Sequence, residues 1–135
     1  IDSDVLAHAE AGVYPAEKIE RIGAERLKRY FMRGTGAHAG TVRVRDELKN
    51  LITFRRLNLM EPWPMRGPFD VIFCRNVIIY FDLHTREQLV ARYRQLLAPG
   101  GLLFLGHSES LTGHVSGFEL CSTTVYRETH GAART

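Results

Sequence analysis

The segment that most constrains the fold of this chain runs from Phe69 to Asp82. Residues 71–74 form a short apolar run, which is typical of a strand buried on both faces of a parallel sheet. Arg75 and Asn76 follow directly, and such side chains are seldom buried unless something pairs with them. In an open α/β sheet the ligand lies where parallel strands end. We therefore predict a strand at 71–74 and a candidate site at Arg75 and Asn76.

The rest of the pattern predicts an α/β fold, because strands alternate with a helix long enough for a parallel crossover. Before the central segment we expect a helix from Ser3 to Gly12 with Ser3 as its cap, a short helix near Pro15, a helix at 24–31, a glycine-rich loop at 33–40, an alternating strand at 41–45, a helical turn at 46–51 and a strand at 52–57. After it we expect a helix capped by Asp82 or Thr85, a strand at 102–105 and an antiparallel hairpin at 118–127, with residues 128–135 as a frayed tail.

Composition fits one soluble globular domain, since the 135 residues are 44% hydrophobic and 24% charged. No apolar stretch approaches the roughly 18 residues that span a bilayer, so we expect no membrane insertion. The chain shows no signal-peptide pattern, and its two cysteines, Cys74 and Cys121, lie far apart without metal-ligand spacing. These features favour a cytoplasmic protein with reduced thiols and no metal. The start inside an apparent helix cap, without Met, suggests a fragment of something longer.

Positive charge is concentrated between residues 30 and 56, where six basic and two acidic residues give a net +4 against +3 for the whole chain. A local basic excess can mark an acidic partner, either nucleic acid or protein, although the sequence slightly favours a solvated hairpin and helix face. No stacking platform of interleaved aromatic residues accompanies the basic residues. We therefore expect no nucleic-acid binding.

Polar residues follow each expected parallel strand: Asn58, then Arg75 and Asn76, then the run from His107 to Glu109. Because parallel strands end at the same edge of a sheet, the sequence predicts that these clusters share one binding crevice. Tyr80 lies four residues beyond Asn76, a spacing that places two side chains on one face of a helical turn.

The run from Gly106 to Ser110 nearly matches the G-x-S-x-G nucleophile elbow of hydrolases. Ser110 replaces the last glycine, and Gly113 and Gly117 occupy the place of the helix that an elbow requires. A hydrolase is therefore not expected, and Ser108 and Glu109 are interpreted as residues that cap the turn after the strand.

Several motifs stand out along the chain: Tyr30–Gly36, Arg43–Arg45, Asn58–Leu59, Phe69–Asp70, Phe73–Val77, Tyr80–Asp82 and Gly106–Glu109. Together they resemble the bacterial chemotaxis receptor methyltransferases, the CheR family of protein-glutamate O-methyltransferases. The combination of Cys-Arg-Asn-Val, Tyr-Phe-Asp and Gly-His-Ser-Glu is the specific part, and the likeness extends from Asp2 to about Arg127.

The resemblance implies a Rossmann-like S-adenosylmethionine-dependent methyltransferase sheet, partial over residues 1–127, with residues 30–56 as an inserted β-subdomain. It implies methyl transfer from S-adenosylmethionine, with S-adenosylhomocysteine as product, to glutamate side chains of methyl-accepting chemotaxis receptors. By matching positions, Asn58, Leu59, Arg75 and Asn76 resemble the cofactor contacts, and Tyr80 resembles the active-site tyrosine. Gly34, Gly36, Gly40 and Arg43 resemble the surface that binds the C-terminal peptide of some receptors, as an extra strand.

The resemblance also indicates what is missing. The family's amino-terminal helical domain and the first strand and loop of its sheet are absent, so the acidic residue for the cofactor ribose would precede Ile1. An alternative therefore stays open: a receptor-peptide binding module without catalytic activity in this truncated form.

Overall fold

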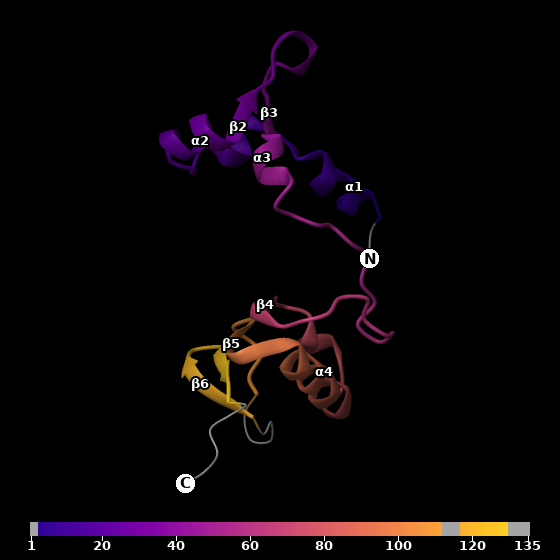
Figure 1. Cartoon of the computed structure of the whole chain (residues 1–135). Helices are drawn as coiled ribbons and strands as arrows, with labels where there is room; N and C mark the ends of the chain where they lie inside the picture. The colour runs from indigo at the N-terminus through magenta and orange to yellow at the C-terminus, as the bar shows by residue number, and fades with distance from the viewer. Residues whose placement is uncertain (1–2, 112–116, 130–135) are drawn as a thin grey trace. The chain divides into compact units, whose positions relative to one another are not determined.

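The computed structural model describes residues 3–111 and 117–129. The chain divides into two compact units, Ile1–Met60 and Glu61–Thr135. Each unit contains its own small sheet, and each is described by itself below (Figure 1).

The first unit contains a three-stranded antiparallel sheet in the order β1-β3-β2, with short helices around it. Its elements are α1 (Ser3–Ala11), β1 (Val13–Pro15), the 3₁₀ turn η1 (Ala16–Ile19), α2 (Ala24–Tyr30), β2 (Phe31–Arg33), the 3₁₀ turn η2 (Gly36–His38), β3 (Thr41–Val44) and α3 (Asp46–Lys49). β3 is the central strand, and its Val42 is buried. Helix α2 leads directly into β2, beside which it lies in Figure 1.

Most of the expected local structure of this unit is confirmed. Gly12, with φ of +65°, ends α1, as a glycine in the left-handed region commonly does. Ser3 is the first helical residue of α1, whereas a cap was expected there. Strand β1 was not predicted, because three residues between two helical segments give no visible alternation.

The strand expected at 52–57 is wrong, since these residues form no strand in the structure. An apolar run becomes a strand only when a neighbouring strand takes up its backbone hydrogen bonds. In the part of the chain that the structure describes, no strand pairs with this segment.

The second unit contains a mixed four-stranded sheet in the order β4-β5-β7-β6. Its elements are β4 (Phe69–Cys74), the 3₁₀ turn η3 (Ile78–Tyr80), α4 (Leu83–Leu96), β5 (Leu97–Leu105), β6 (Phe118–Ser122) and β7 (Val125–Glu128). β4 and β5 are parallel and are joined by α4, whereas β6 and β7 form the expected antiparallel hairpin. This arrangement confirms the α/β class and the parallel crossover. β5 begins at Leu97, earlier than expected, with a register irregularity near Gly100 and Gly101.

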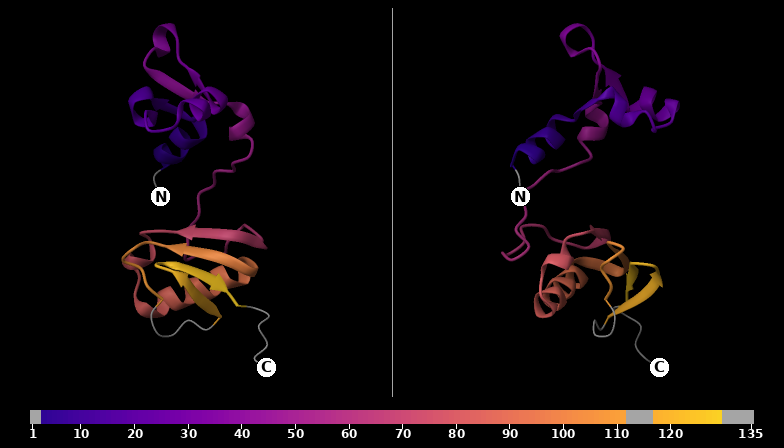
Figure 2. Two further views of the ribbon diagram at one scale, coloured as in Figure 1. Left: turned by 90° about the vertical axis from the view of Figure 1, so that its left-hand side faces the viewer. Right: turned by 180° about the vertical axis from the view of Figure 1, so that it is seen from behind.

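Helix α4 packs along one face of this sheet, as Figure 2 shows. Asp82 caps it by accepting a hydrogen bond from the Thr85 backbone N–H at 2.9 Å, which confirms Asp82 as the cap. Leu89, Val90 and Tyr93 are buried on its inner side, and Leu103 and Leu105 are buried in β5. The Tyr93 hydroxyl lies 3.1 Å from the Cys74 sulfur and ties the helix to the end of β4. Among the described residues, no helix is both long and apolar enough to cross a membrane.

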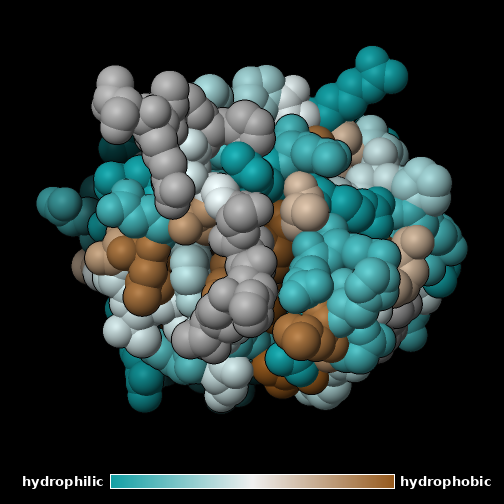
Figure 3. Space-filling view, turned by 90° about the horizontal axis from the view of Figure 1, so that it is seen from below, coloured by the Kyte–Doolittle hydropathy of each residue, from teal (hydrophilic) through white to brown (hydrophobic). Residues whose placement is uncertain are grey.

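The prediction that β4 is buried on both faces is wrong. Cys74 points to the buried side, whereas Val71 and Phe73 are 41% and 68% exposed. Phe73 stacks on Phe104 of β5, with 4.5 Å between ring centroids. α4 covers one face of the pair, and no described element of this unit covers the other. The apolar side chains of Val71 and Phe73 therefore reach the surface. Figure 3 shows the molecule from below, where other apolar residues (brown) lie between hydrophilic ones (teal).

Candidate functional site

The candidate site lies where β4 and β5 end side by side. Cys74 of β4 pairs with Leu105 of β5, so the residues that follow them, Arg75 and Gly106, leave the same edge of the sheet. After Cys74 the chain makes a sharp turn, hereafter the 75–80 turn, which runs through η3 before α4 begins. Asn76 has φ of +58°, in the left-handed region that asparagine tolerates better than most residues. The sheet and this strained residue together set the direction of the turn.

The carboxylate of Glu109 holds the 75–80 turn against the end of β5. Its Oε2 accepts hydrogen bonds from the backbone N–H groups of Asn76 and Gly106, at 2.8 and 2.6 Å. Its Oε1 accepts from the N–H groups of Val77 and Ile79, at 2.7 and 3.2 Å. Glu109 is only 2% exposed, so one buried side chain satisfies four backbone donors from two segments.

These hydrogen bonds also decide the charge of Glu109. Burial alone raises the pKa of a carboxyl group, but the N–H groups of Gly106, Asn76, Ile79 and Val77 together outweigh it. The pKa of Glu109 is therefore lowered from its ordinary value, and the group is an anion at neutral pH. The sequence analysis treated Glu109 as a turn cap and missed its reach to the neighbouring strand. The sequence pattern that could have indicated this contact is a glutamate three residues after the glycine that follows a core strand.

Gly106 is the only residue type that fits its position in this site. A Cβ atom there would lie 2.5 Å from Asn76 Oδ1 and 2.7 Å from Glu109 Oε2. Both distances are too short for any real side chain, and the nearby Asn76 backbone nitrogen cannot move away cheaply. The close approach of the two strand ends therefore requires glycine at position 106.

The turn presents polar side chains to solvent. Arg75 and Asn76 are exposed, and Tyr80, at the end of η3, is 81% exposed. The helical turn starts only at Ile78, so helical spacing does not relate Asn76 to Tyr80 as the sequence suggested. Among the described residues, no hydrogen bond or ion pair engages the Arg75 guanidinium or the Tyr80 hydroxyl. These groups are available to a ligand.

The structure brings two of the three expected clusters together at one edge of the sheet, the 75–80 turn and the Gly106–Glu109 segment. A binding crevice at this edge stays a prediction. Asn58 and Leu59 belong to the first unit, where Asn58 Oδ1 accepts a hydrogen bond from the Met60 N–H at 3.0 Å. Their place beside the turn stays a prediction.

Hydrolase chemistry finds no support at Ser108. The residue is exposed, and its hydroxyl bonds to no base within residues 3–111 and 117–129. Across the same residues, no three His, Cys, Asp or Glu side chains gather in a way that could hold a metal ion.

A second surface surrounds the glycine-rich loop between β2 and β3. A Cβ on Gly34 would collide with the backbone carbonyl of His38, and Gly36 and Gly40 have φ of +58° and +82°. The loop's own conformation thus requires all three glycines. Arg43 on β3 is half-exposed and donates to Asp46 Oδ1 at 2.6 Å. Strand β2 is an edge of its sheet, so its outer backbone groups can accept another strand.

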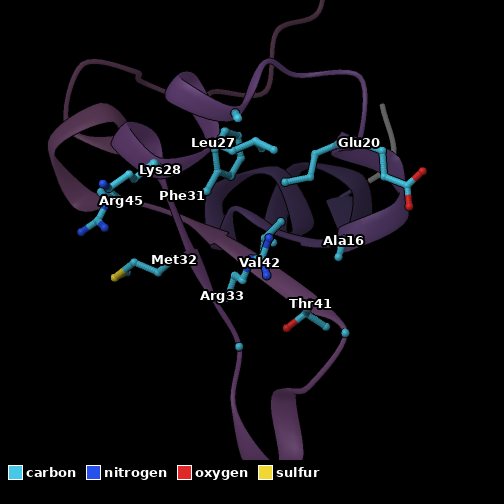
Figure 4. Close-up of a pocket in the computed structure, with 14 residues that line it drawn as sticks. Ala16, Glu20, Leu27, Lys28, Phe31, Met32, Arg33, Thr41, Val42 and Arg45 are labelled. Carbon is cyan, nitrogen blue, oxygen red and sulfur yellow. The ribbon is translucent and has the colours of Figure 1, made fainter.

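Beside this loop lies a hollow of about 950 Å³ between the helical segments and the sheet. Its lining combines apolar side chains with basic ones, drawn in Figure 4: Leu27, Lys28, Phe31, Arg33, Val42 and Arg45 among others. The Nε of Arg45 is buried and has no hydrogen-bond partner within the described part of the chain. Sequence reasoning located the basic segment but not the hollow, because residues 16–28 join it only through the tertiary fold.

Comparison with known proteins places these features in context. The family model described as "CheR methyltransferase, SAM binding domain" matches residues 1–127. The chemotaxis protein methyltransferases of Salmonella typhimurium and Escherichia coli are 50% and 49% identical to the chain over 127 residues, which is 93% of the chain and 44% of each relative. Chemotaxis protein methyltransferase 2 of Pseudomonas aeruginosa is 51% identical over 111 residues, which is 82% of the chain and 40% of that protein. The chain thus spans less than half the length of these curated relatives.

Proposed function

The chain belongs to the CheR methyltransferase family, through its SAM-binding domain, and on this basis we propose that its protein is a protein-glutamate O-methyltransferase. The reaction transfers a methyl group from S-adenosylmethionine to glutamate side chains of chemotaxis receptors, in the cytoplasm, during chemotactic adaptation. The observation that carries this proposal is the family match over residues 1–127, joined to the exposed 75–80 turn at the parallel strand ends. Residues 1–127 then form part of a catalytic domain, with 30–56 as its inserted β-subdomain.

The residues of the 75–80 turn suit the polar part of S-adenosylmethionine. Arg75 offers an exposed guanidinium that has no partner among the described residues, which fits a carboxylate. Asn76 offers both an amide donor and a carbonyl acceptor, which fit hydroxyl and amino groups. In this proposal Arg75 and Asn76 form one wall of the cofactor site, and Asn58 and Leu59 contribute further contacts.

Little acid–base work is required of the chain itself. A receptor glutamate is already ionised near neutral pH, and S-adenosylmethionine supplies a methyl group that is already activated. The chain's residues have to align the carboxylate and keep water away from it. We assign the alignment to Tyr80, whose exposed hydroxyl can donate a hydrogen bond to one carboxylate oxygen.

Receptor recognition is assigned to the second surface. The open edge of β2 and the adjoining Gly34, Gly36 and Gly40 allow a receptor's C-terminal peptide to approach the backbone closely and add as a strand. Arg43 would pair with an acidic group of that peptide in competition with Asp46. The basic and apolar lining of the nearby hollow fits the same kind of ligand.

The test is methyl transfer by the native polypeptide that contains this chain. Incubation with labelled S-adenosylmethionine and a receptor cytoplasmic fragment should label the fragment with base-labile methyl esters. A fragment whose acceptor glutamates are changed to alanine is the control and should stay unlabelled. Labelling that survives mild base, or no labelling at all, would overturn the proposal.

A second candidate function rests on the hollow and the open β2 edge in the first unit. In this case the chain binds a receptor peptide without catalysis. Isothermal titration of the chain separates the two: binding of the peptide without S-adenosylmethionine favours the module, and binding of both favours the enzyme.

A further inference from the structure

Glu109 is buried, yet its carboxylate accepts hydrogen bonds from the 75–80 turn, which carries the exposed residues of the proposed site. We propose that Glu109 is a positioning residue, whose carboxylate fixes the backbone of the 75–80 turn so that Arg75, Asn76 and Tyr80 are presented to cofactor and substrate. This inference rests on the proposed function and adds a residue outside the contacts assigned to it.

The division of hydrogen bonds between the two carboxylate oxygens supports this role. Oε2 joins Asn76 of the turn to Gly106 of β5, and so ties the turn to the sheet edge. Oε1 bonds Val77 and Ile79, and so reaches the residue just before Tyr80. A single rigid group therefore spans the turn from Asn76, a proposed cofactor residue, to Ile79, the residue just before Tyr80.

The exposed side chains of the turn depend on this backbone. Arg75 and Tyr80 bond to no other described side chain, so their positions follow from the main chain alone. Arg86 adds a complementary support, since its guanidinium donates to the carbonyls of Phe81 and Ile79 at 2.7 and 3.1 Å. Glu109 thus binds backbone N–H groups of the turn, whereas Arg86 binds the backbone carbonyl groups of Ile79 and Phe81.

Burial of an anion carries a desolvation cost, and an apolar side chain in its place would leave four backbone N–H donors without an acceptor. Glu109 forms no ion pair with a described cation, and its known partners are the four backbone donors. What the carboxylate provides that an apolar residue cannot is a fixed geometry for those donors. Fixed geometry matters most for a turn that carries a site.

The test uses the native polypeptide, with Glu109→Gln as the main variant. Glutamine keeps the shape but has one acceptor oxygen, so two of the four donors would face its NH₂ group. Val90→Ala, a buried change in α4 away from the turn, is the control for lost stability. Kinetics with S-adenosylmethionine and a receptor fragment are expressed per folded molecule, from unfolding curves measured alongside.

We expect Glu109→Gln to raise KM for S-adenosylmethionine roughly 10- to 100-fold, as small displacements of positioning groups do. Val90→Ala should lower the unfolding midpoint and leave KM unchanged. A wild-type KM in Glu109→Gln, or an equal rise in Val90→Ala, overturns this inference while the proposed function stands. Absence of methyl transfer by the wild type overturns both.

A measurement on the wild type covers the case in which Glu109→Gln does not fold. If Glu109 fixes the turn, the amides of Asn76, Val77, Ile79 and Gly106 should be protected from hydrogen exchange before any cofactor is added. Exchange as fast as that of exposed loop amides would contradict the inference.

Discussion

The carboxylate of Glu109 accepts a 2.7 Å hydrogen bond from the backbone N–H of Val77, a residue 32 positions earlier in the chain. This bond joins the segments that follow two parallel strands. It explains how an exposed turn keeps one conformation although Asn76 has its backbone in the left-handed region. The proposed cofactor residues owe their placement to an acidic side chain that solvent barely reaches.

The first prediction concerns pH. Because the folded-state pKa of Glu109 is lowered, its contribution to stability is complete above the unfolded value of about 4.3 and is lost as pH falls through the folded value. Urea unfolding should therefore show stability falling as pH drops below about 5, with a smaller fall in Glu109→Gln. The cap residue Asp82, whose pKa is also lowered, acts in the same direction, so Asp82→Asn is the comparison. If the free energy of unfolding falls equally steeply with pH in Glu109→Gln and in the wild type, the prediction is contradicted.

The second prediction concerns Tyr80. Tyr80→Phe removes only a hydroxyl that bonds to no described residue, so stability should change by less than about 0.5 kcal/mol. If the hydroxyl orients the substrate carboxylate, kcat for receptor methylation should fall roughly 10- to 1,000-fold. Tyr30→Phe in α2 is a matched control and should keep wild-type kcat. Wild-type kcat in Tyr80→Phe would remove Tyr80 from the mechanism.

The third prediction separates the backbone of Asn76 from its side chain. Glycine tolerates φ of +58° without strain, so Asn76→Gly should preserve the turn while deleting the carboxamide. Loss of one ligand hydrogen bond, about 0.5–1.5 kcal/mol, should weaken S-adenosylmethionine binding roughly two- to tenfold in isothermal titration. Asn76→Ala should in addition lower the unfolding free energy by about 1–2 kcal/mol. An unchanged affinity in Asn76→Gly would show that the side chain makes no contact.

The fourth prediction concerns Arg43. Its ion pair with Asp46 is exposed, so Asp46→Asn should change stability by no more than about 1 kcal/mol. The same change frees the guanidinium and should strengthen binding of an acidic receptor-tail peptide, whereas Arg43→Ala should weaken it. Fluorescence anisotropy with a labelled peptide measures both. If peptide affinity changes in the same direction in Asp46→Asn and Arg43→Ala, Arg43 does not bind the peptide.

The fifth prediction compares two leucines of α4. Leu89 is fully buried and Leu83 is 67% exposed. Leu89→Ala should cost about 2–5 kcal/mol of unfolding free energy, because it leaves a cavity under the sheet. Leu83→Ala should cost less than about 0.5 kcal/mol. Equal costs in denaturant unfolding would mean that α4 does not pack as described.

The elements that sequence reasoning predicted well are those whose signals are local. Gly12 ends α1, Asp82 caps α4, and the apolar spacing of α4 marks its buried side. The placement of Arg75 and Asn76 at the end of β4 also follows from the pattern alone. These features depend on a few neighbouring residues and need no knowledge of the tertiary fold.

The features that it missed depend on partners distant in sequence. Residues 52–57 have the composition of a strand but lack a partner strand, and Phe73 has an apolar side chain but no cover in the described chain. The reach of Glu109 to Val77 requires knowing that β4 and β5 are adjacent and parallel. Short-range patterns do not contain that information.

We propose that the turn held by Glu109 forms one wall of the S-adenosylmethionine site. The decisive experiment is titration of S-adenosylhomocysteine into ¹⁵N-labelled native polypeptide, followed by two-dimensional NMR. We expect saturable shifts of the amide signals of Arg75, Asn76, Val77 and Gly106, with little change in β6 and β7. Saturable binding that leaves these four signals in place would contradict it.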